Sequence, residues 1–512
     1  MKNNFGKKIL TYFREYCDCT SVHGFRYLGE KRTLFEKIWW FIVFTICLST
    51  CIFSIFMVYK KWEQSPVIVS FANRGTPIYK IPFPAVTICP ETKTNRNIFN
   101  YTQILNKKFH EENLTETENL YFEHMLLICN KFYPASGSNE STYGEEFFDT
   151  ISTIHPKFNI RQCKNQGQSY NCSQIFTPIF TEEGICFSFN MLDRSEIFRE
   201  NVIHYKNFHQ FNKSSSWSIE SGYGSNSGIW TYPQRALLAG AKNGFSIQLI
   251  SSKSNLDFLC RMGPQGFKVL VHSPASFPTP SQEYFRVPLD QTVIAEVQPT
   301  MINTSDSVRA YSKDRRRCYF QTERYLQYFK IYNKVNCEIE CLANFTLDMC
   351  GCVNFFMPRD NSTSICSSSN LSCMNEAEKI LQIKNLKGKL DKKKKKKSVD
   401  DCDCLPLCSD LNYNIETSQS DWDWQMVFTA IGMEPFNDTY ISSLTIYFKS
   451  NDFITSVRNE LYGPMDFVAN FGGLLGLFTG FSILSLMEII YFLTVRIFCN
   501  KILYRKWAGK DS

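Results

Sequence analysis

The residue types that suggest chemistry stand in one apolar segment near the end of the chain, from Met465 to Phe498. Its only charged residues are Asp466, Glu488 and Arg496. Ionisable groups inside a membrane are costly and usually line an aqueous path. The segment also holds more glycine than a simple anchoring helix needs, at Gly472, Gly473, Gly476 and Gly480. Together these residues predict a segment that lines a pore.

A first apolar segment, from Trp39 to Tyr59, contains no charge. About 20 such residues are enough to cross a bilayer core. The charged and polar stretch before it argues against a cleaved signal peptide. We therefore expect two membrane spans. The expected division is a cytoplasmic segment 1–38, a first span 39–59, an extracellular cysteine-rich domain 60–463, a pore-lining span 464–498 and a cytoplasmic tail 499–512.

Two independent signals predict the orientation of these spans. All Asn-X-Ser/Thr sequons, the acceptors of N-glycosylation, lie between them. Residues 1–38 carry eight basic against four acidic side chains, and basic residues beside a span stay in the cytoplasm. We therefore expect a multi-pass plasma-membrane protein with both termini cytoplasmic. The expected glycan acceptors are Asn100, Asn113, Asn139, Asn171, Asn212, Asn303, Asn344, Asn361, Asn370 and Asn437.

The cysteines agree with an extracellular middle. Of 21 cysteines, sixteen fall between Cys89 and Cys408. An even number in an oxidising compartment predicts a complete disulfide framework, whose connectivity the spacing alone does not fix. Metal binding is the alternative for the tight pairs at 350/352 and 402/404. Thiols outside the cell oxidise, so we expect no metal.

Several stretches predict local structure in the extracellular part. Phe267–His272 and Leu444–Phe448 alternate apolar and polar residues, as half-buried strands do. Because Leu444–Phe448 comes before the second span, we expect it to couple the outer domain to the pore helix. Thr117–Lys131 has the pattern of an amphipathic helix, and the Ser/Gly-rich residues 214–228 indicate a loop.

No motif points to catalysis. The chain has no nucleophile elbow, P-loop, dinucleotide fingerprint or HExxH pattern, and its seven histidines are scattered. The net charge of +7 depends on the six lysines Lys392–Lys397, without which it would be +1. We expect neither an enzyme nor a cofactor nor a nucleic-acid partner.

Four stretches, in the required order, resemble the degenerin, epithelial sodium channel and acid-sensing ion channel family, and look closest to its pickpocket branch. They are His23-Gly24, Phe83–Cys89, the ten-cysteine array from Cys318 to Cys408, and Gly472–Glu488. The resemblance covers nearly the whole chain. It implies an α+β membrane protein, in which two transmembrane helices flank a hand-like, disulfide-rich, mixed α/β extracellular domain with palm, thumb and finger parts.

The resemblance also implies roles for single residues. Gly480, Phe481 and Ser482 match the Gly-X-Ser selectivity filter, where small residues and backbone carbonyls of three subunits surround a dehydrating ion. Gly476 falls at the amiloride site, and Ala469 at the degenerin position, where bulky residues are expected to hold such channels open. Glu488 matches an acidic position near the inner mouth. His23 and Gly24 match a cytoplasmic gating motif.

The family's disulfide pairing, carried over to this chain, is Cys89–Cys186, Cys163–Cys172, Cys318–Cys408, Cys337–Cys404, Cys341–Cys402, Cys350–Cys373 and Cys352–Cys366. Cys129 and Cys260 are left over, and we predict that they pair with each other.

The implied function is one subunit of a trimeric, amiloride-sensitive, sodium-selective cation channel, gated by a mechanical, peptide or chemosensory stimulus outside the cell. The implied partners are sodium ions, amiloride-type blockers, membrane lipid and related subunits in a homo- or heterotrimer. Two departures bear on the stimulus and the conductance. Arg315 stands where acid-sensing members carry an aromatic residue, so proton gating does not follow, and Tyr491 replaces a second acidic position.

Two other classes share part of this pattern. ATP-gated purinergic channels have two spans and ten outer cysteines, but lack the Gly-X-Ser filter and the Phe-Pro-Ala-Val-Thr sequence. A two-span glycosylated receptor or lipid-binding protein without a conducting pore would need neither the glycine ladder nor Glu488.

Overall fold

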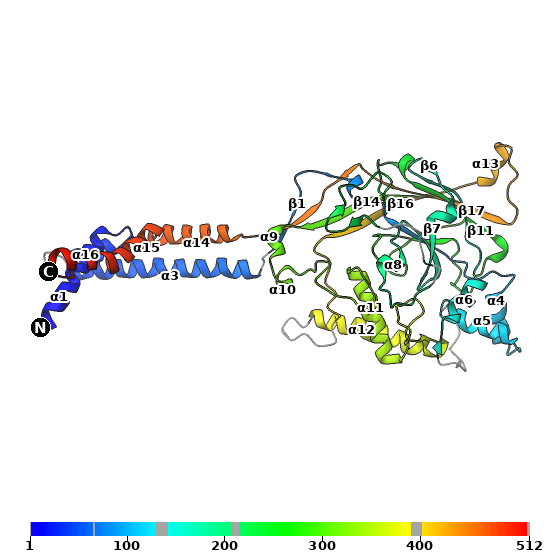
Figure 1. Cartoon of the computed structure of the whole chain (residues 1–512), viewed down its shortest axis with the longest axis horizontal. Coiled ribbons are helices and arrows are strands. Elements are labelled where there is room, and N and C mark those ends of the chain that lie inside the picture. Colours follow the sequence, from blue (N-terminus) through cyan, green and yellow to red (C-terminus); the bar gives the residue numbers. More distant parts are fainter. Residues whose placement is uncertain are drawn as a thin grey trace. The chain divides into compact units, whose positions relative to one another are not determined.

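The computed structural model describes residues 2–64, 67–129, 142–205, 208, 215–390 and 402–508, and Figure 1 gives the element labels. The chain forms two compact units, which we describe separately. The first contains Met1–Val69, Ser305–Arg316 and Arg458–Ser512, and the second contains Ser70–Thr304 and Arg317–Val457. The lysine run Lys392–Lys397 and the expected glycan acceptors Asn139 and Asn212 lie outside the described residues.

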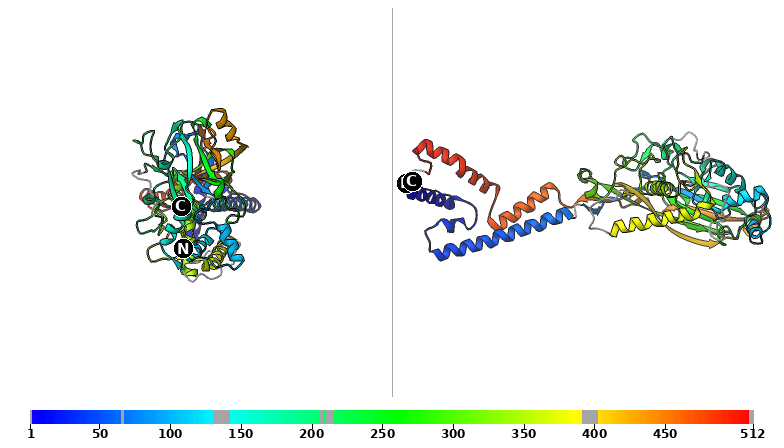
Figure 2. Two further views of the ribbon diagram at one scale, coloured as in Figure 1. Left: turned by 90° about the vertical axis from the view of Figure 1, so that its right-hand side faces the viewer. Right: turned by 90° about the horizontal axis from the view of Figure 1, so that it is seen from below.

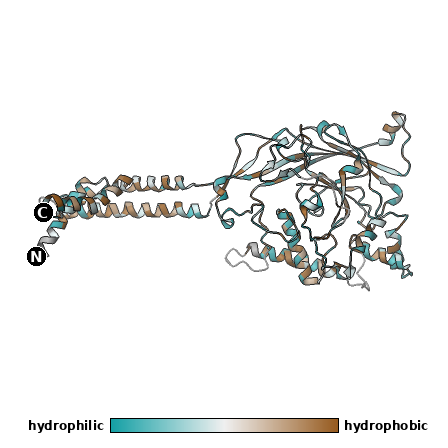
Figure 3. Ribbon diagram, in the orientation of Figure 1, coloured by the Kyte–Doolittle hydropathy of each residue, from teal (hydrophilic) through white to brown (hydrophobic). Residues whose placement is uncertain are grey.

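The first unit is built on long apolar helices. α3 (Leu34–Gln64) has 31 residues, and the second apolar segment forms α14 (Pro464–Thr479), α15 (Ile483–Ile490), the π-helix η5 (Tyr491–Val495) and α16 (Arg496–Tyr504). Two helical runs, Leu34–Gln64 and Ile483–Tyr504, are long and apolar enough to cross a membrane. Figure 3 shows their predominantly hydrophobic colouring. α14 packs alongside α3, as the right-hand view of Figure 2 shows.

Shorter helices complete this unit. α1 (Lys2–Cys19) and α2 (Phe25–Gly29) precede α3 and pack against each other. α9 (Asp306–Arg309) and α10 (Lys313–Arg316) come from the middle of the chain. Two strands, β1 (Val67–Phe71) and β19 (Ser456–Glu460), carry the chain between the two units.

The second unit contains a large sheet with the strand order β14-β17-β11-β5-β6, and β16 pairs with β14 on the other side. The bounds are β14 (Gln291–Thr304), β17 (Thr439–Phe448), β11 (Phe245–Ser252), β5 (Asn159–Asn165), β6 (Gln168–Ser169) and β16 (Asp410–Asp421). β17 runs parallel to β14 and antiparallel to β11, so hydrogen bonds hold it on both edges.

The prediction of a strand at Leu444–Phe448 is confirmed by the end of β17. β17 lies in the interior of the sheet, between β14 and β11. The short strand β18 (Asp452–Phe453) and then β19 follow it, and β19 leads directly into α14. Alternation of apolar and polar residues indicates that one face of a strand is buried. It does not indicate how many further strands come before the next helix.

A second sheet has the order β13-β12-β3-β8-β7. Its strands are β13 (Phe285–Val287), β12 (Phe267–His272), β3 (Ala85–Pro90), β8 (Gly184–Phe189) and β7 (Phe176–Thr181). The prediction of a strand at Phe267–His272 is therefore confirmed by β12. One apolar core joins both sheets, with Ile88, Leu249 and Leu444 fully buried in it.

Helices cover the remaining parts of the second unit. They are α4 (Tyr101–Phe109), α5 (Glu116–Leu126), α6 (Glu146–Ile154), α7 (Cys172–Ile175), α8 (Arg194–Ile197), α11 (Lys334–Cys350), α12 (Leu371–Leu390) and α13 (Trp424–Ala430). The helix expected at Thr117–Lys131 is α5, which a Thr115/Glu118 capping box starts and which ends at Leu126. The expected loop 214–228 contains a small hairpin of β9 (Trp217–Ser218) and β10 (Gly222–Tyr223). The other short strands are β2 (Thr76–Pro77), β4 (Thr142–Tyr143) and β15 (Ile365–Cys366).

Eight disulfides cross-link the second unit. Cys337 and Cys341, four residues apart on α11, bridge to Cys404 and Cys402, and Cys350 at the end of α11 bridges to Cys373 on α12. The others are Cys89–Cys186, Cys129–Cys260, Cys163–Cys172, Cys318–Cys408 and Cys352–Cys366. Cys17, Cys19, Cys47, Cys51 and Cys499 are free thiols. The bridges hold α11 firmly against the 402–408 segment.

A buried ionic cluster lies at one end of the second sheet. The Lys93 side chain is 2% exposed and the Glu183 side chain 5%. The Glu183 carboxylate is shared by Arg261, by Lys268 at 2.7 Å and by Lys93 at 3.6 Å. Burial lowers the pKa of Lys93 to about 8, since the attraction of Glu183 only partly offsets the desolvation of the ammonium group. The Lys93 ammonium group therefore loses its proton at a lower pH than an ordinary lysine does.

We predict a pH-dependent effect of Lys93→Met on stability. Below pH 8 both folded and unfolded chains protonate Lys93. Above it the unfolded chain holds the extra proton, so wild-type stability rises with pH toward the ordinary lysine pKa. The Met variant lacks this rise. A depression of this size corresponds to ~3 kcal/mol of difference between the two chains across the window.

Thermal unfolding midpoints of the full-length chain in detergent, from pH 7 to 10, provide the measurement. Lys242→Met, at an exposed lysine, serves as the matched control and should run parallel to the wild type. A Lys93→Met curve parallel to the control would show that Lys93 does not titrate in this window.

Candidate functional site

The second apolar segment breaks in the middle. α14 ends at Thr479, Gly480 adopts a left-handed backbone conformation with φ of 64°, and Ser482 caps the next helix. The Ser482 hydroxyl accepts from the Ser485 amide at 3.3 Å, and the Ser482 amide donates to the Ser485 hydroxyl at 3.0 Å. Residues 480–482 therefore form a short non-helical link between two helices, in which backbone groups are no longer used inside a helix.

A turn from the beginning of the chain lies against this link. The His23 amide donates to the Thr479 carbonyl at 2.9 Å. The His23 ring lies so close to Gly480 that a Cβ there would approach it to 2.8 Å. Gly24 has a φ of 87° and stands at the N-cap position of α2, just before Phe25. Only glycine meets both demands at Gly480, a positive φ and contact with a ring.

Ser21 adds side-chain contacts to the same turn. Its hydroxyl is 2.7 Å from the Ser485 hydroxyl and 3.3 Å from a Glu488 carboxylate oxygen, and its amide donates to that oxygen at 3.2 Å. The acidic group in the apolar segment is therefore held by the amino-terminal turn. His23, Gly24, Gly480 and Glu488 come together here from opposite ends of the chain.

One face of α14 is bare. A Cβ added at Gly472, Gly473 or Gly476 would meet nothing within 4 Å. Ala469, farther toward the start of α14, is exposed. Small residues allow helices to approach one another closely. This face is thus available to neighbouring helices around an axis, or to an ion path. Gly476 and Ala469 do not take part in the His23 contact.

The other two charged residues of the apolar segment have structural partners. Asp466 accepts from the Gly463 amide at 3.0 Å and caps the start of α14. Arg496 pairs with Glu15 of α1. Of the three charges, Glu488 alone lies beside the helix break.

Sequence reasoning missed a second cluster, at the opposite end of α14. The Arg315 guanidinium lies 4.1 Å from the Trp62 ring centroid and 4.1 Å from that of Tyr311. The Trp62 indole donates to the Tyr462 carbonyl at 3.2 Å, and the Tyr311 hydroxyl donates to Glu460 at 3.1 Å. Cation–π contacts of this kind contribute about 0.5–2 kcal/mol each. The cluster joins the end of α3, the α9–α10 segment and the start of α14.

The sequence carries one signal for this cluster. Arg315 is a basic residue at a position where acid-sensing members of the resembled family carry an aromatic one. A guanidinium group needs an aromatic or acidic partner when it is partly covered. Nothing local in the sequence indicates that Trp62, some 250 residues away, is that partner.

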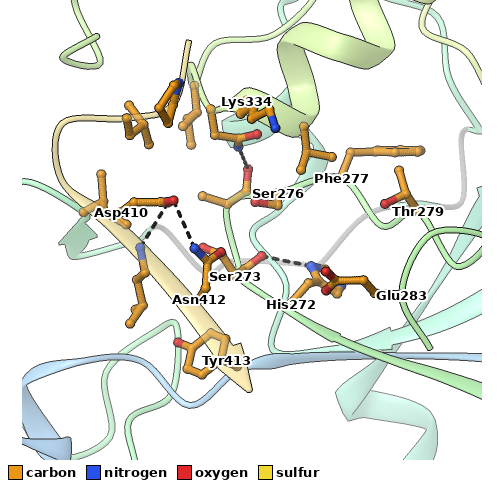
Figure 4. A pocket seen from close by; sticks show the side chains of 18 of the residues that line it. His272, Ser273, Ser276, Phe277, Thr279, Glu283, Lys334, Asp410, Asn412 and Tyr413 are labelled. Atoms are coloured by element: carbon orange, nitrogen blue, oxygen red, sulfur yellow. Dashed lines mark hydrogen bonds between the residues drawn. The ribbon is translucent and has the colours of Figure 1, made fainter. Parts of the chain in front are cut away.

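The second unit contains a cavity of about 480 Å³ between the loop after β12, the beginning of α11 and the beginning of β16. Figure 4 shows His272, Glu283, Lys334 and Asp410 around it. His272 uses both ring nitrogens, at 2.8 Å from the Thr87 hydroxyl and 2.9 Å from the Ser273 carbonyl, and burial lowers its pKa to about 4. The Asp410 carboxylate accepts from the Asn412 amide at 3.1 Å. The cavity is therefore lined by both apolar and hydrogen-bonding groups, and no sequence motif marks it.

Comparisons with known proteins bear on this geometry. A family model described as amiloride-sensitive sodium channel matches residues 16–492. Pickpocket protein 28 of Drosophila melanogaster is 29% identical over 504 residues, which cover 94% of this chain and 78% of the relative. Sodium channel protein Nach of the same fly is 24% identical over 512 residues, covering 94% and 86%. Degenerin deg-1 of Caenorhabditis elegans is 21% identical over 262 residues, covering 49% and 32%.

The geometry at Gly480 predicts a specific loss of stability. An alanine there is strained by about 1–2 kcal/mol in the left-handed region and also displaces the His23 ring. Gly480→Ala should therefore lower the thermal unfolding midpoint of the purified full-length chain. Gly6→Ala is the matched control, since Gly6 lies in α1 and a Cβ there meets nothing within 4 Å.

Gly6→Ala should leave the midpoint unchanged or raise it, because alanine is the better helix former. Equal midpoints for the two variants would contradict the contact between the amino-terminal turn and the helix break.

Proposed function

Because the chain belongs to the amiloride-sensitive sodium channel family, we propose that it is one subunit of a trimeric, amiloride-sensitive, sodium-selective cation channel gated by an extracellular stimulus. Sodium ions are then the transported species, and related subunits are the partners in a homo- or heterotrimer. Membrane embedding is consistent with the two candidate spans.

The observation that carries the proposal is the helix break at residues 480–482. Three copies of such a link, arranged around an axis, would present backbone oxygens and a serine to a dehydrating ion. The open glycine face of α14 supports close approach of the three helices. In this proposal Gly480, Phe481 and Ser482 form the selectivity filter, Gly476 contributes to the amiloride site and Glu488 attracts cations near the inner mouth.

We also propose a plasma-membrane location with both termini in the cytoplasm and residues 60–463 outside. The excess of basic residues before the first span supports this orientation. So does the exposure of the glycan acceptors. None of the eight that fall within the described residues is buried; they are Asn100, Asn113, Asn171, Asn303, Asn344, Asn361, Asn370 and Asn437.

The proposed gating path follows the chain itself. β14 continues into α9 and α10, and β19 continues into α14. Movement of the disulfide-linked domain would therefore pull on the segments that carry Arg315 and Glu460. Their contacts with Trp62 and Tyr311 connect the two segments to the end of α3. A shift of this cluster would change the position of α14 and so the opening near Ala469.

Ala469→Val tests the channel without knowledge of the stimulus. A bulkier side chain should crowd the closed arrangement of α14 helices and leave the pore open. We expect a steady inward current in whole-cell voltage clamp that depends on bath sodium and is blocked by amiloride. Ala430→Val, at the end of α13 in the second unit, is the matched substitution and should stay silent.

Surface labelling must show equal amounts of both variants. Silence of Ala469→Val at normal surface level, alone and with a related subunit, would favour a two-span receptor or binding protein without a conducting pore.

Substitutions in the filter should separate selectivity from block. Ser482→Ala removes the hydroxyl that caps α15, which contributes about 1 kcal/mol to stability. The link between α14 and α15 then loses its hydrogen bond from the Ser485 amide. In the Ala469→Val background we expect this change to lower the sodium-to-potassium permeability ratio, measured from reversal potentials. Gly476→Ala should weaken amiloride block instead, with selectivity retained. Ser49→Ala, in α3, is the control for both; if Ser482→Ala leaves the reversal potential unchanged, residues 480–482 are not the filter.

A further inference from the structure

A groove lies where the two sheets of the second unit meet, and it shares no lining residue with the cavity beside α11. Residues of β5 and β11 line it from the large sheet, and residues of β7 and β8 line it from the second sheet. Its volume is about 680 Å³, within the ~300–1,000 Å³ of clefts that hold small organic groups. We call it the aromatic groove, because Phe158, Phe176 and Phe187 line it.

The three phenylalanine rings form a partly open apolar surface. Phe158 and Phe187 stack with their ring centroids 3.9 Å apart, and the ring of Phe176 meets that of Phe158 edge-on at 6.1 Å. Phe158 and Phe187 are partly exposed, whereas Phe176 is buried. Apolar surface that is left open inside a polar border usually marks a place where another group packs.

The border of the aromatic groove is polar and almost uncharged. Asn159, Arg161 and Gln162 line it from β5, and all three are exposed. Among the described residues that line the groove, Arg161 is the only charged one, and its guanidinium lies 4.4 Å from the Phe436 ring centroid. A cationic ligand would find no carboxylate there. The border suits a neutral group that has several hydrogen-bonding atoms.

A sequon stands on the same border. Asn171, Cys172 and Ser173 all line the aromatic groove, and Asn171 is exposed. Cys172 is disulfide-bonded to Cys163, which follows Gln162 on β5. The bridge therefore holds the glycan acceptor beside the β5 side of the groove.

The Asn171 side chain is oriented by its oxygen and leaves its nitrogen open. Its Oδ1 accepts from the Ser173 amide at 3.2 Å and from the Ser173 hydroxyl at 2.9 Å. Within the described parts of the chain, no group accepts a hydrogen bond from its Nδ2. N-linked glycans are attached at this nitrogen. The first sugar of a glycan on Asn171 therefore starts at the border of the aromatic groove.

We propose that the N-glycan of Asn171 lies in the aromatic groove, with its first N-acetylglucosamine rings against Phe158 and Phe187. Such a sugar is neutral and has a face of C–H groups, which packs on an aromatic ring. Its acetamido and hydroxyl groups find partners in Asn159, Arg161 and Gln162. The proposal rests on the proposed location of residues 60–463 outside the cell, because glycans are added on that side alone.

A neighbouring subunit is the competing occupant of the aromatic groove. A protein surface that covered Phe158 and Phe187 would also cover Asn171, since both lie on the same groove. Asn171 would then carry no glycan in the assembled protein. The two occupants therefore exclude each other, and the state of Asn171 decides between them.

Site-resolved release of the glycans tests the contact. The full-length chain is made in mammalian cells, purified in detergent and treated, while folded, with peptide-N-glycosidase F in heavy-oxygen water. Each released acceptor becomes a labelled aspartate, which mass spectrometry counts site by site. We expect release at Asn171 to be about tenfold slower than at Asn113 and Asn361, which are exposed and lie outside both cavities. After denaturation the three sites should be released at equal rates.

Substitutions in the groove connect slow release to the rings. Phe158→Leu removes a ring face and keeps an apolar side chain, so release at Asn171 should approach the rate at Asn113. Arg161→Gln, at the exposed border, should accelerate it as well without a change in the core. Phe258→Leu is the matched control, since Phe258 is 56% exposed and lines neither cavity. It should leave release at Asn171 slow.

The outcomes separate this inference from the function on which it rests. An unmodified Asn171 in a chain whose other acceptors carry glycans would overturn the inference and favour a protein occupant. Equal release rates at Asn171, Asn113 and Asn361 in the folded chain would also overturn it. So would release that stays slow in both Phe158→Leu and Arg161→Gln, because the glycan would then be held elsewhere. The absence of glycans from every acceptor would instead contradict the proposed extracellular location.

Discussion

The hydrogen bond from the His23 amide to the Thr479 carbonyl is the contact on which the proposed pore depends. A helix that ends inside a membrane leaves backbone groups without partners, and hydrocarbon offers no water to satisfy them. At this break, Gly480 donates to the Gly476 carbonyl, the Thr479 hydroxyl to the Leu475 carbonyl, and His23 to the carbonyl of Thr479. The amino-terminal turn therefore completes the second apolar segment. Without it, the Thr479 carbonyl would lose this partner at the break.

This dependence places further demands on nearby residues. Gly480 must lack a side chain because the His23 ring lies against it, and Gly24 must turn the chain back toward α3. Ser21 holds the Glu488 carboxylate on the same side of the segment. In contrast, the glycines of α14 have no internal reason to be small, since a Cβ at Gly472, Gly473 or Gly476 would enter open space. Glycine is the poorest residue for a helix after proline. The open face that these glycines form agrees with the proposed packing of α14 against neighbouring copies.

Local patterns predicted local features of this protein well. Alternation at Phe267–His272 identified β12, and the amphipathic pattern at Thr117–Lys131 identified α5, which ends at Leu126. The two apolar helices followed from composition along the chain, and the mixed α/β fold between them followed from the family resemblance. What sequence reasoning missed depends on contacts between distant residues. The place of Leu444–Phe448 in the sheet is decided by β14 and β11, and the pairing of Arg315 with Trp62 is decided by how three segments meet. The His23 turn was identified as a motif, yet only the structure brings it to Gly480.

The Arg315 cluster at the other end of α14 bears on how the proposed channel could be gated. Arg315 is held there between the rings of Trp62 and Tyr311, which come from two different segments of the chain. Two aromatic rings around a guanidinium group fix its position through charge and shape. Glu460, which accepts from Tyr311, continues this set of contacts from β19 into α14. A connection built in this way transmits displacement of the attached segments. Such a connection fits the proposed gating by a stimulus that moves the extracellular domain.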